Sequence, residues 1–231
     1  ALGLDPKAGG FDFNLGFLIQ KEYDPSVFFL PVDFIYLVLL GIIIGIFAEL
    51  YSRYVLLMQN LGKKWYKNKF VLKMSICGLI LGSIYSFLPS TFHNLDELQK
   101  VIAEQNTSIG IALLAVLVLF ITTGLAAASG APGGLFYPML TLGGAIGLIM
   151  GSWVEIATGH APSTYIFAGM GAFVAGCSRT PITAMFLAFA LTKNLLIMKP
   201  VLISCIASFL IARAFNEESI YERQIQIELE D

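Results

Sequence analysis

The sequence predicts an all-α integral membrane protein built from tilted and broken helices. Hydrophobic residues make up 57% of the chain and charged residues only 13%, whereas a soluble domain normally carries about 25% charged residues. The apolar residues form long runs separated by short polar segments, and several runs are long enough to cross a hydrocarbon core of about 30 Å. We therefore expect a multi-pass protein in contact with the lipid bilayer, in a plasma or inner membrane rather than in an organelle.

The charged and reactive side chains exclude several classes of protein. The net charge is −2, and no basic face indicates nucleic acid as a partner. Cys77, Cys177 and Cys205 lie in apolar surroundings without metal-ligand spacing, which is typical of small core residues. His160 has no cysteine or carboxylate at ligand spacing, so we expect neither a metal nor a cofactor. No charged segment precedes an apolar core at the start, so we expect no signal peptide and a chain that is trimmed or part of a longer polypeptide.

The long apolar runs are expected to form helices. They cover residues 33–58, 70–88, 109–127, 136–157 and 195–214. Residues 1–31 mix charges, glycines and phenylalanines, which predicts an interfacial or loop segment with little readable structure. The lysine-rich loop 62–69 is placed in the cytoplasm by the positive-inside rule. Residues 95–105 are then expected to form a short helix on the opposite, outer side of the membrane.

Two further apolar runs are too short to cross a membrane. They cover residues 164–175 and 182–191, and the polar break 176–181 between them contains Arg179. Short helices around a polar break occur in transporters and channels, where they are buried in protein rather than exposed to lipid. The sequence therefore predicts re-entrant or half-crossing segments here.

Glu49 lies near the end of the first apolar run. A carboxylate inside a membrane span is a candidate functional group. Arg53 follows it at i+4, the favourable order for an ion pair within a helix. A structural ion pair of Glu49 with Arg53 near the membrane interface is the simpler interpretation. The functional and the structural interpretation of Glu49 are both kept.

The end of the chain, residues 216–231, predicts a charged amphipathic helix. Asn216 is expected to cap it, because acidic residues follow in the first turn. Tyr221 would then lie near the helix start with its hydroxyl able to donate a hydrogen bond.

The stretch Ser129-Gly130-Ala131-Pro132-Gly133-Gly134-Leu135-Phe136-Tyr137-Pro138 interrupts the apolar sequence at membrane depth. Three glycines and two prolines within ten residues do not continue a helix. Gly133 and Gly134 allow backbone conformations closed to other residues and expose their amides to close approach, and Pro138 suits the first turn of a new helix. A helix N-terminus inside a membrane presents unpaired N–H groups to an anion. A kinked span with a packing glycine pair is the alternative.

Several ordered motifs resemble the CLC family of chloride channels and chloride/proton exchangers. Gly134-Leu135-Phe136-Tyr137-Pro138 is similar to the family's G-x-F-x-P motif, and residues 168–172 and 178–183 are similar to the two helices that follow it. Residues 41–58 resemble the helix that opens this half of the family fold. Ser219-Ile220-Tyr221 resembles the start of the last family helix.

This resemblance implies one of the two inverted repeats of a CLC-type fold. Residues 32–215 correspond to the C-terminal half of the membrane domain and residues 216–231 to the final helix leading to the cytoplasm, with no CBS domains. The family's G-S-G-I-P and G-[RK]-E-G-P motifs are not in this sequence, so the N-terminal half of the same protein is an expected partner. Because those motifs carry the gating glutamate, channel and antiport activity are both compatible with the sequence. A homodimer through residues 182–191 and 195–214 is also implied.

The resemblance also implies the substrate and the residues that hold it. Chloride is the transported ion, accompanied by protons in an exchanger. Backbone amides at Gly134, Leu135, Phe136 and Tyr137 would bind the chloride, and the Tyr221 hydroxyl would donate to the same ion. Neutral N–H and O–H donors bind a weakly hydrated anion without trapping it, as conduction requires.

Two other functions are kept as alternatives. A broken-helix carrier could transport another anion, such as nitrate or fluoride. An intramembrane serine protease would use Ser129 with His160 as its base, but His160 is expected in a loop. The protein is therefore expected not to be an enzyme.

Overall fold

The computed structural model describes residues 33–65, 70–103, 108–130, 133–159, 164–192 and 195–229, and every regular element in these ranges is a helix. The elements follow in the order α2 (Asp33–Trp65), α3 (Phe70–Ser86), η1 (Ser90–Phe92), α4 (Leu95–Ala103), α5 (Ile109–Ser129), α6 (Phe136–Thr158), α7 (Thr164–Ser178), α8 (Pro181–Thr192), η2 (Leu195–Ile197), α9 (Met198–Phe215) and α10 (Ile220–Leu229). The expected interfacial segment 1–31, part of the lysine-rich loop and His160 lie outside the described residues.

The expectation of a multi-pass membrane protein is confirmed by the lengths of the helices. Four described segments are long and apolar enough to span a bilayer: Asp33–Lys64, Ile109–Ser129, Phe136–Thr158 and Leu195–Leu229. At 1.5 Å per residue α2 is about 50 Å long, well beyond a hydrocarbon core of about 30 Å. Such a helix must tilt or project from the bilayer, and it runs to Trp65, past the expected end at residue 58 and into the expected lysine-rich loop. The last of the four segments runs through both α9 and α10.

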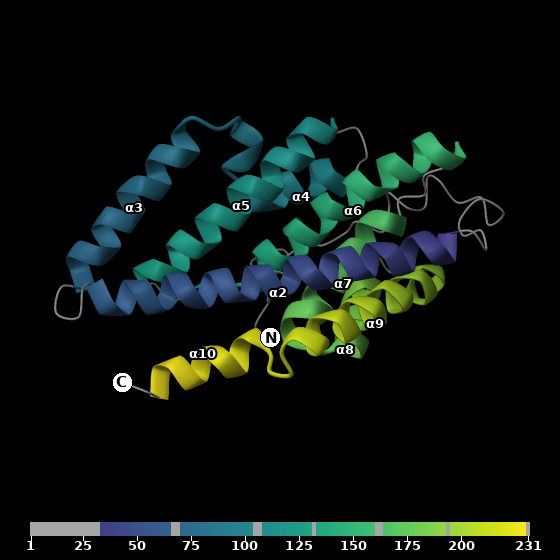
Figure 1. Ribbon diagram of the computed structural model, residues 1–231. Coiled ribbons are helices and arrows are strands. Elements are labelled where there is room, and N and C mark those ends of the chain that lie inside the picture. Colours follow the sequence, from purple (N-terminus) through teal and green to yellow (C-terminus); the bar gives the residue numbers. More distant parts are fainter. Residues whose placement is uncertain are drawn as a thin grey trace, which may run out of the picture.

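Helix α7 is the centre of the fold, although it is too short to span. Every residue from Thr164 to Cys177 is buried, and α7 packs against α2, α6, α8 and α9. Its 15 residues extend only about 22 Å. In Figure 1, α3, α4, α5 and α6 lie on one side of α2, and α8, α9 and α10 lie on the other. The prediction of short helices buried in protein is confirmed for α7, but α8 buries only Ala184, Met185, Ala188, Leu191 and Thr192 and exposes Ile182 and Phe186.

The break between α7 and α8 is narrower than the sequence predicted. Helix α7 continues through Gly176 to Ser178, and only Arg179 and Thr180 separate it from α8. Gly176 allows a close helix contact instead of a break, because a Cβ there would lie 2.7 Å from the Ala48 Cβ and from the Ser208 Oγ. Arg179 has φ 62°, a left-handed conformation that non-glycine residues seldom adopt.

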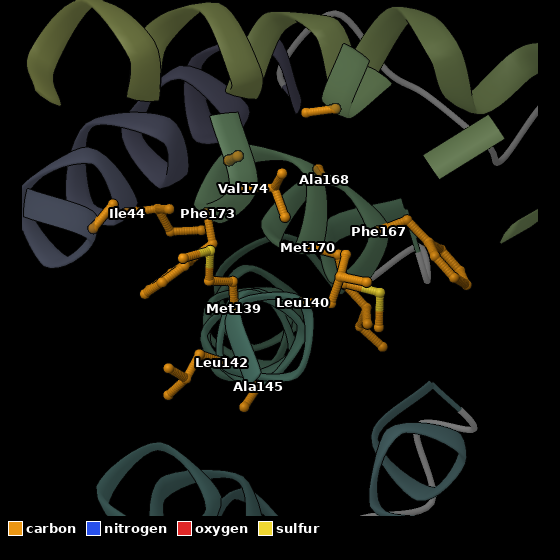
Figure 2. Close-up of a cluster of buried hydrophobic side chains, with 14 of the residues drawn as sticks. Ile44, Met139, Leu140, Leu142, Ala145, Phe167, Ala168, Met170, Phe173 and Val174 are labelled. Atoms are coloured by element: carbon orange, nitrogen blue, oxygen red, sulfur yellow. The ribbon is translucent and has the colours of Figure 1, made fainter. Parts of the chain in front are cut away.

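The backbones of α6 and α7 touch through glycines. A Cβ on Gly143 would lie 2.3 Å from the Gly169 carbonyl oxygen, and one on Gly169 would lie 2.3 Å from the Gly143 carbonyl oxygen. Small residues of this kind allow membrane helices to pack closely. Figure 2 shows Met139 and Leu140 of α6 pointing toward α7, while Leu142 lies on the opposite side of α6.

Candidate anion-binding site

The connection between α5 and α6 forms a helix break at the predicted place. Helix α5 ends at Gly130, which has φ 72° and donates its amide to the Ala127 carbonyl. Helix α6 begins at Phe136 with Pro138 in its first turn, as expected. Among the described residues of this break, Gly130 has the positive φ, and none is recorded for Gly134. A left-handed glycine is the usual way to end a helix.

The start of α6 has no side-chain cap. The N-cap residue is Leu135, and leucine has no acceptor that could receive a hydrogen bond from the first-turn amides. The Met139 amide donates to the Leu135 carbonyl at 3.1 Å, so regular helical bonding begins only there. A helix start without a side-chain cap and the helix dipole together favour a negative charge at this end.

A cavity of about 770 Å³ opens at this helix start. The break contributes Gly130, Gly133, Gly134, Leu135 and Pro138; α5 contributes Thr122 and Thr123; α2 contributes Gln59 and Lys63; and α10 contributes Gln224 and Glu228. Polar bonds join α2 and α10 along its wall, since Gln224 Nε2 donates to Gln59 Oε1 at 3.3 Å and Lys63 Nζ donates to the Ile227 carbonyl at 3.0 Å. The start of α6 and the last helix therefore share one cavity.

Tyr221 lies in the first turn of α10, as predicted, but Asn216 does not cap that helix. Ser219 and Glu222 form a reciprocal capping box: the Ser219 amide donates to Glu222 Oε2 at 2.6 Å, and the Glu222 amide donates to Ser219 Oγ at 3.2 Å. The sequence pattern S-x-x-E signals this motif. Asn216 instead ends α9, and its side chain accepts a hydrogen bond from the Glu218 amide.

The structure brings part of the expected site together. Gly134 and Leu135 line the cavity, and Phe136 and Tyr137 form the first turn of α6. Tyr221 is 40% exposed. Within the described part of the chain, no hydrogen bond joins the Tyr221 hydroxyl to the α6 start, so the five-residue site stays a prediction.

Tyr51 is a polar residue of this region that the sequence did not single out. Its side chain is fully buried, and its ring packs edge-on against Phe120 and Phe173. The hydroxyl lies near Thr123 and Tyr221, yet among the described residues it has no hydrogen-bond partner. A tyrosine inside an apolar run carries no sequence signal that separates it from an ordinary core aromatic.

Glu49 pairs with Arg53, and it pairs with two distant arginines as well. Arg53 Nε lies 2.9 Å from Glu49 Oε1, which confirms the predicted pair. Arg179 Nη2 lies 2.8 Å from Oε2, and the Arg223 guanidinium donates to both carboxylate oxygens at 3.1 Å. These arginines are 130 and 174 residues away along the chain. Sequence spacing revealed only the local partner.

Of the two residues of the protease alternative, the structure describes Ser129 but not His160. Ser129 is buried, and its hydroxyl donates to the Ala126 carbonyl of the same helix at 2.7 Å. His160 lies outside the described residues, and His93 is within 2.8 Å of the Tyr85 carbonyl. Among the described residues, no group of three or more His, Cys, Asp or Glu side chains could hold a metal ion.

A short apolar helix buried among longer ones, and a helix start that opens on a cavity, are typical of integral membrane proteins of the broken-helix transporter and channel class. The chain belongs to the voltage-gated chloride channel family, because the family model described as "Voltage gated chloride channel" matches residues 11–213. The match begins within the segment 1–31 and ends before Tyr221. The resemblance to the CLC family is therefore confirmed.

Known bacterial relatives and solved structures agree with this family. The chain is 29% identical to the H+/Cl− exchange transporter ClcA of Vibrio parahaemolyticus over 80% of the chain and 41% of that protein. It is 30% identical to ClcA of Klebsiella pneumoniae over 85% of the chain and 43% of that protein. The structure resembles that of a slow cyanobacterial Cl−/H+ antiporter, with a TM-score of 0.74 and 25% identity over 87% of the chain and 48% of the antiporter chain.

A eukaryotic CLC transporter shares the fold, with a TM-score of 0.70 and 21% identity over 88% of this chain and 37% of that chain. The chain thus spans less than half the length of the proteins that it matches. The predicted fold class, an all-α integral membrane protein with a CLC-type arrangement of helices, is confirmed.

Proposed function

We propose that this chain is the C-terminal half of a protein that transports chloride across a membrane. The observation that carries the proposal is the start of α6, where first-turn amides without a side-chain cap open on a cavity in a member of the chloride channel family. The chloride would lie at the amides of Gly134 to Tyr137.

The chemistry of this helix start suits a halide. Backbone N–H groups and a helix dipole offer partial positive charge without a full cation, so the ion is held but can leave. The Tyr221 hydroxyl would complete the site, because α10 lines the same cavity through Gln224 and Glu228. No lysine or arginine needs to touch the ion in this arrangement.

We propose exchange with protons as the mode of transport, with a channel as the alternative. The relatives reported above are named H+/Cl− exchange transporters, and the cyanobacterial structure is a Cl−/H+ antiporter. The partners would be chloride, protons, the N-terminal half of the same protein and a second copy, which would pack through α8 and α9. The location would be a bacterial plasma membrane.

The test is ion flux in liposomes that contain the full-length protein. Chloride release would be read with a chloride electrode and proton movement with a pH electrode, and protein-free vesicles are the control. Coupled chloride and proton flux is expected. Chloride flux without proton movement would support the channel alternative, and nitrate or fluoride flux without chloride flux would overturn the proposed substrate. A fluorophosphonate probe that labels Ser129 would overturn the non-enzymatic assignment.

A further inference from the structure

The Glu49 carboxylate joins three parts of the chain. Its side chain is only 4% exposed, and those of Arg179 and Arg223 are 7% and 11% exposed. Glu49 belongs to α2, Arg179 to the break between α7 and α8, and Arg223 to α10. Arg223 binds both carboxylate oxygens, a bidentate geometry that fixes direction as well as distance. Removing the acid would leave two buried guanidinium groups without their counter-charge.

Arg179 extends this cluster to the beginning of the last helix. Its Nε and Nη2 donate to the Asn216 carbonyl at 3.3 and 3.1 Å, where α9 ends and the chain turns into α10. The left-handed backbone of Arg179 costs conformational energy, and such residues persist only where the surroundings hold them. The ion pair with Glu49 and the bonds to Asn216 are those surroundings.

Helix α10 depends on polar contacts for its position against α2. Three hydrogen bonds join the two helices: Arg223 donates to Glu49, Gln224 donates to Gln59, and Lys63 donates to the Ile227 carbonyl. The two helices run in the same direction along this row, since residue numbers rise together on both. Arg223 is two residues after Tyr221, so the Glu49 pair acts within one turn of the tyrosine.

We propose that Glu49 is a positioning residue that sets the height and rotation of α10, and thereby the place of the Tyr221 hydroxyl. Its consequence for the anion rests on the proposed function, whereas the placement of α10 does not. Arg53 pairs with the same carboxylate but is 60% exposed and lies on Glu49's own helix. Arg53 therefore supplies a matched control that loses a Glu49 pair without releasing α10.

The first measurement is the distance between α10 and α2 in the full-length protein. Spin labels are placed at Ile225 and Leu57, which are 57% and 55% exposed, in a Cys77→Ser background. Glu49→Gln is expected to broaden or shift the distance distribution, and Arg53→Gln is expected to leave it unchanged. If Glu49→Gln fails to fold, Arg223→Lys loses the bidentate pair but keeps the charge and is expected to broaden the distribution too. Folded variants with the wild-type distance would overturn the inference.

The second measurement is the chloride affinity, determined by calorimetry in a double-mutant cycle of Glu49→Gln and Tyr221→Phe. Glu49→Gln is expected to weaken binding by about tenfold, the loss expected for one misaligned donor. In the Tyr221→Phe background, Glu49→Gln is expected to have no further effect, because the hydroxyl that it positions is absent. Additive losses would overturn the link between Glu49 and Tyr221. If Tyr221→Phe binds chloride normally, the proposed ligand role of Tyr221 fails, while the spin-label distances still decide the placement of α10.

Discussion

The sharpest prediction concerns the uncapped start of α6. Replacing Leu135 by aspartate places a carboxylate beside the first-turn amides that are proposed to hold chloride. The cavity beside Leu135 makes room for the side chain, and a carboxylate at a helix N-terminus is itself favourable by about 0.3–1 kcal/mol. Leu135 is half-buried and packs against the hydrophobic core, so Leu135→Asp is expected to lose roughly 1 kcal/mol of apolar packing but still to fold, with a carboxylate in its anion site.

The expected loss follows from electrostatics. A carboxylate about 4 Å from a bound chloride, near the surface of an open cavity, repels it by about 4 kcal/mol. That energy corresponds to a loss of about a thousandfold in affinity. Leu135→Asn is the matched control, because it has the same size and hydrogen-bonding reach without the charge, and it should lose no more than about tenfold.

The measurements are chloride binding by calorimetry, chloride flux in liposomes and thermal unfolding of all three proteins. Equal losses in Leu135→Asp and Leu135→Asn would show that charge is not the cause. Normal chloride binding by Leu135→Asp would show that the anion does not lie at the start of α6, and the proposed site would be rejected.

Three further predictions test the packing and the tyrosines. Gly169→Ala should cost about 1–3 kcal/mol of unfolding free energy by overpacking, because its Cβ would meet the Gly143 carbonyl. Gly78→Ala is the control, because a Cβ at Gly78 meets nothing within 4 Å, and it should be neutral or stabilising. Equal losses of stability in the two variants would contradict the α6–α7 contact. Tyr51→Phe should keep or raise stability by up to about 1 kcal/mol, since it removes an unpaired buried hydroxyl; a clear loss in denaturant unfolding would reveal a bond. Tyr221→Phe should weaken chloride binding by about tenfold without lowering the melting temperature, and a lower melting temperature would point to a structural role.

The helices were predictable because apolar runs and breakers act locally. The starts of α2, α5 and α6 agree with the sequence prediction, since Pro31 precedes α2, a polar segment precedes α5 and a glycine-rich segment precedes α6. The predictions that were wrong concern residues whose role depends on contacts with other helices. Gly176 looked like a breaker but serves a contact with α2 and α9.

The candidate site was predictable only in part, for the same reason. The α6 start is marked by Pro138 and the glycines before it, which are neighbours in sequence. The role of Ser219 as the cap of α10 was also encoded locally, as S-x-x-E, and was overlooked in favour of Asn216. The partners of Glu49 could not be found in this way, because nothing in the spacing of Arg179 and Arg223 points to an acid on α2.

The burial of α7 has a consequence for how the chain is made in the membrane. Helix α7 is about 22 Å long, and its sides are covered by α2, α6 and α9. It is therefore too short to be a stable transmembrane helix without these neighbours. During synthesis α7 leaves the ribosome before α9 exists, so one of its faces has no protein to cover it until residues 198–215 follow. Insertion of α7 is therefore completed by a helix that comes later in the chain, and truncation before α9 should leave α7 accessible to labelling reagents.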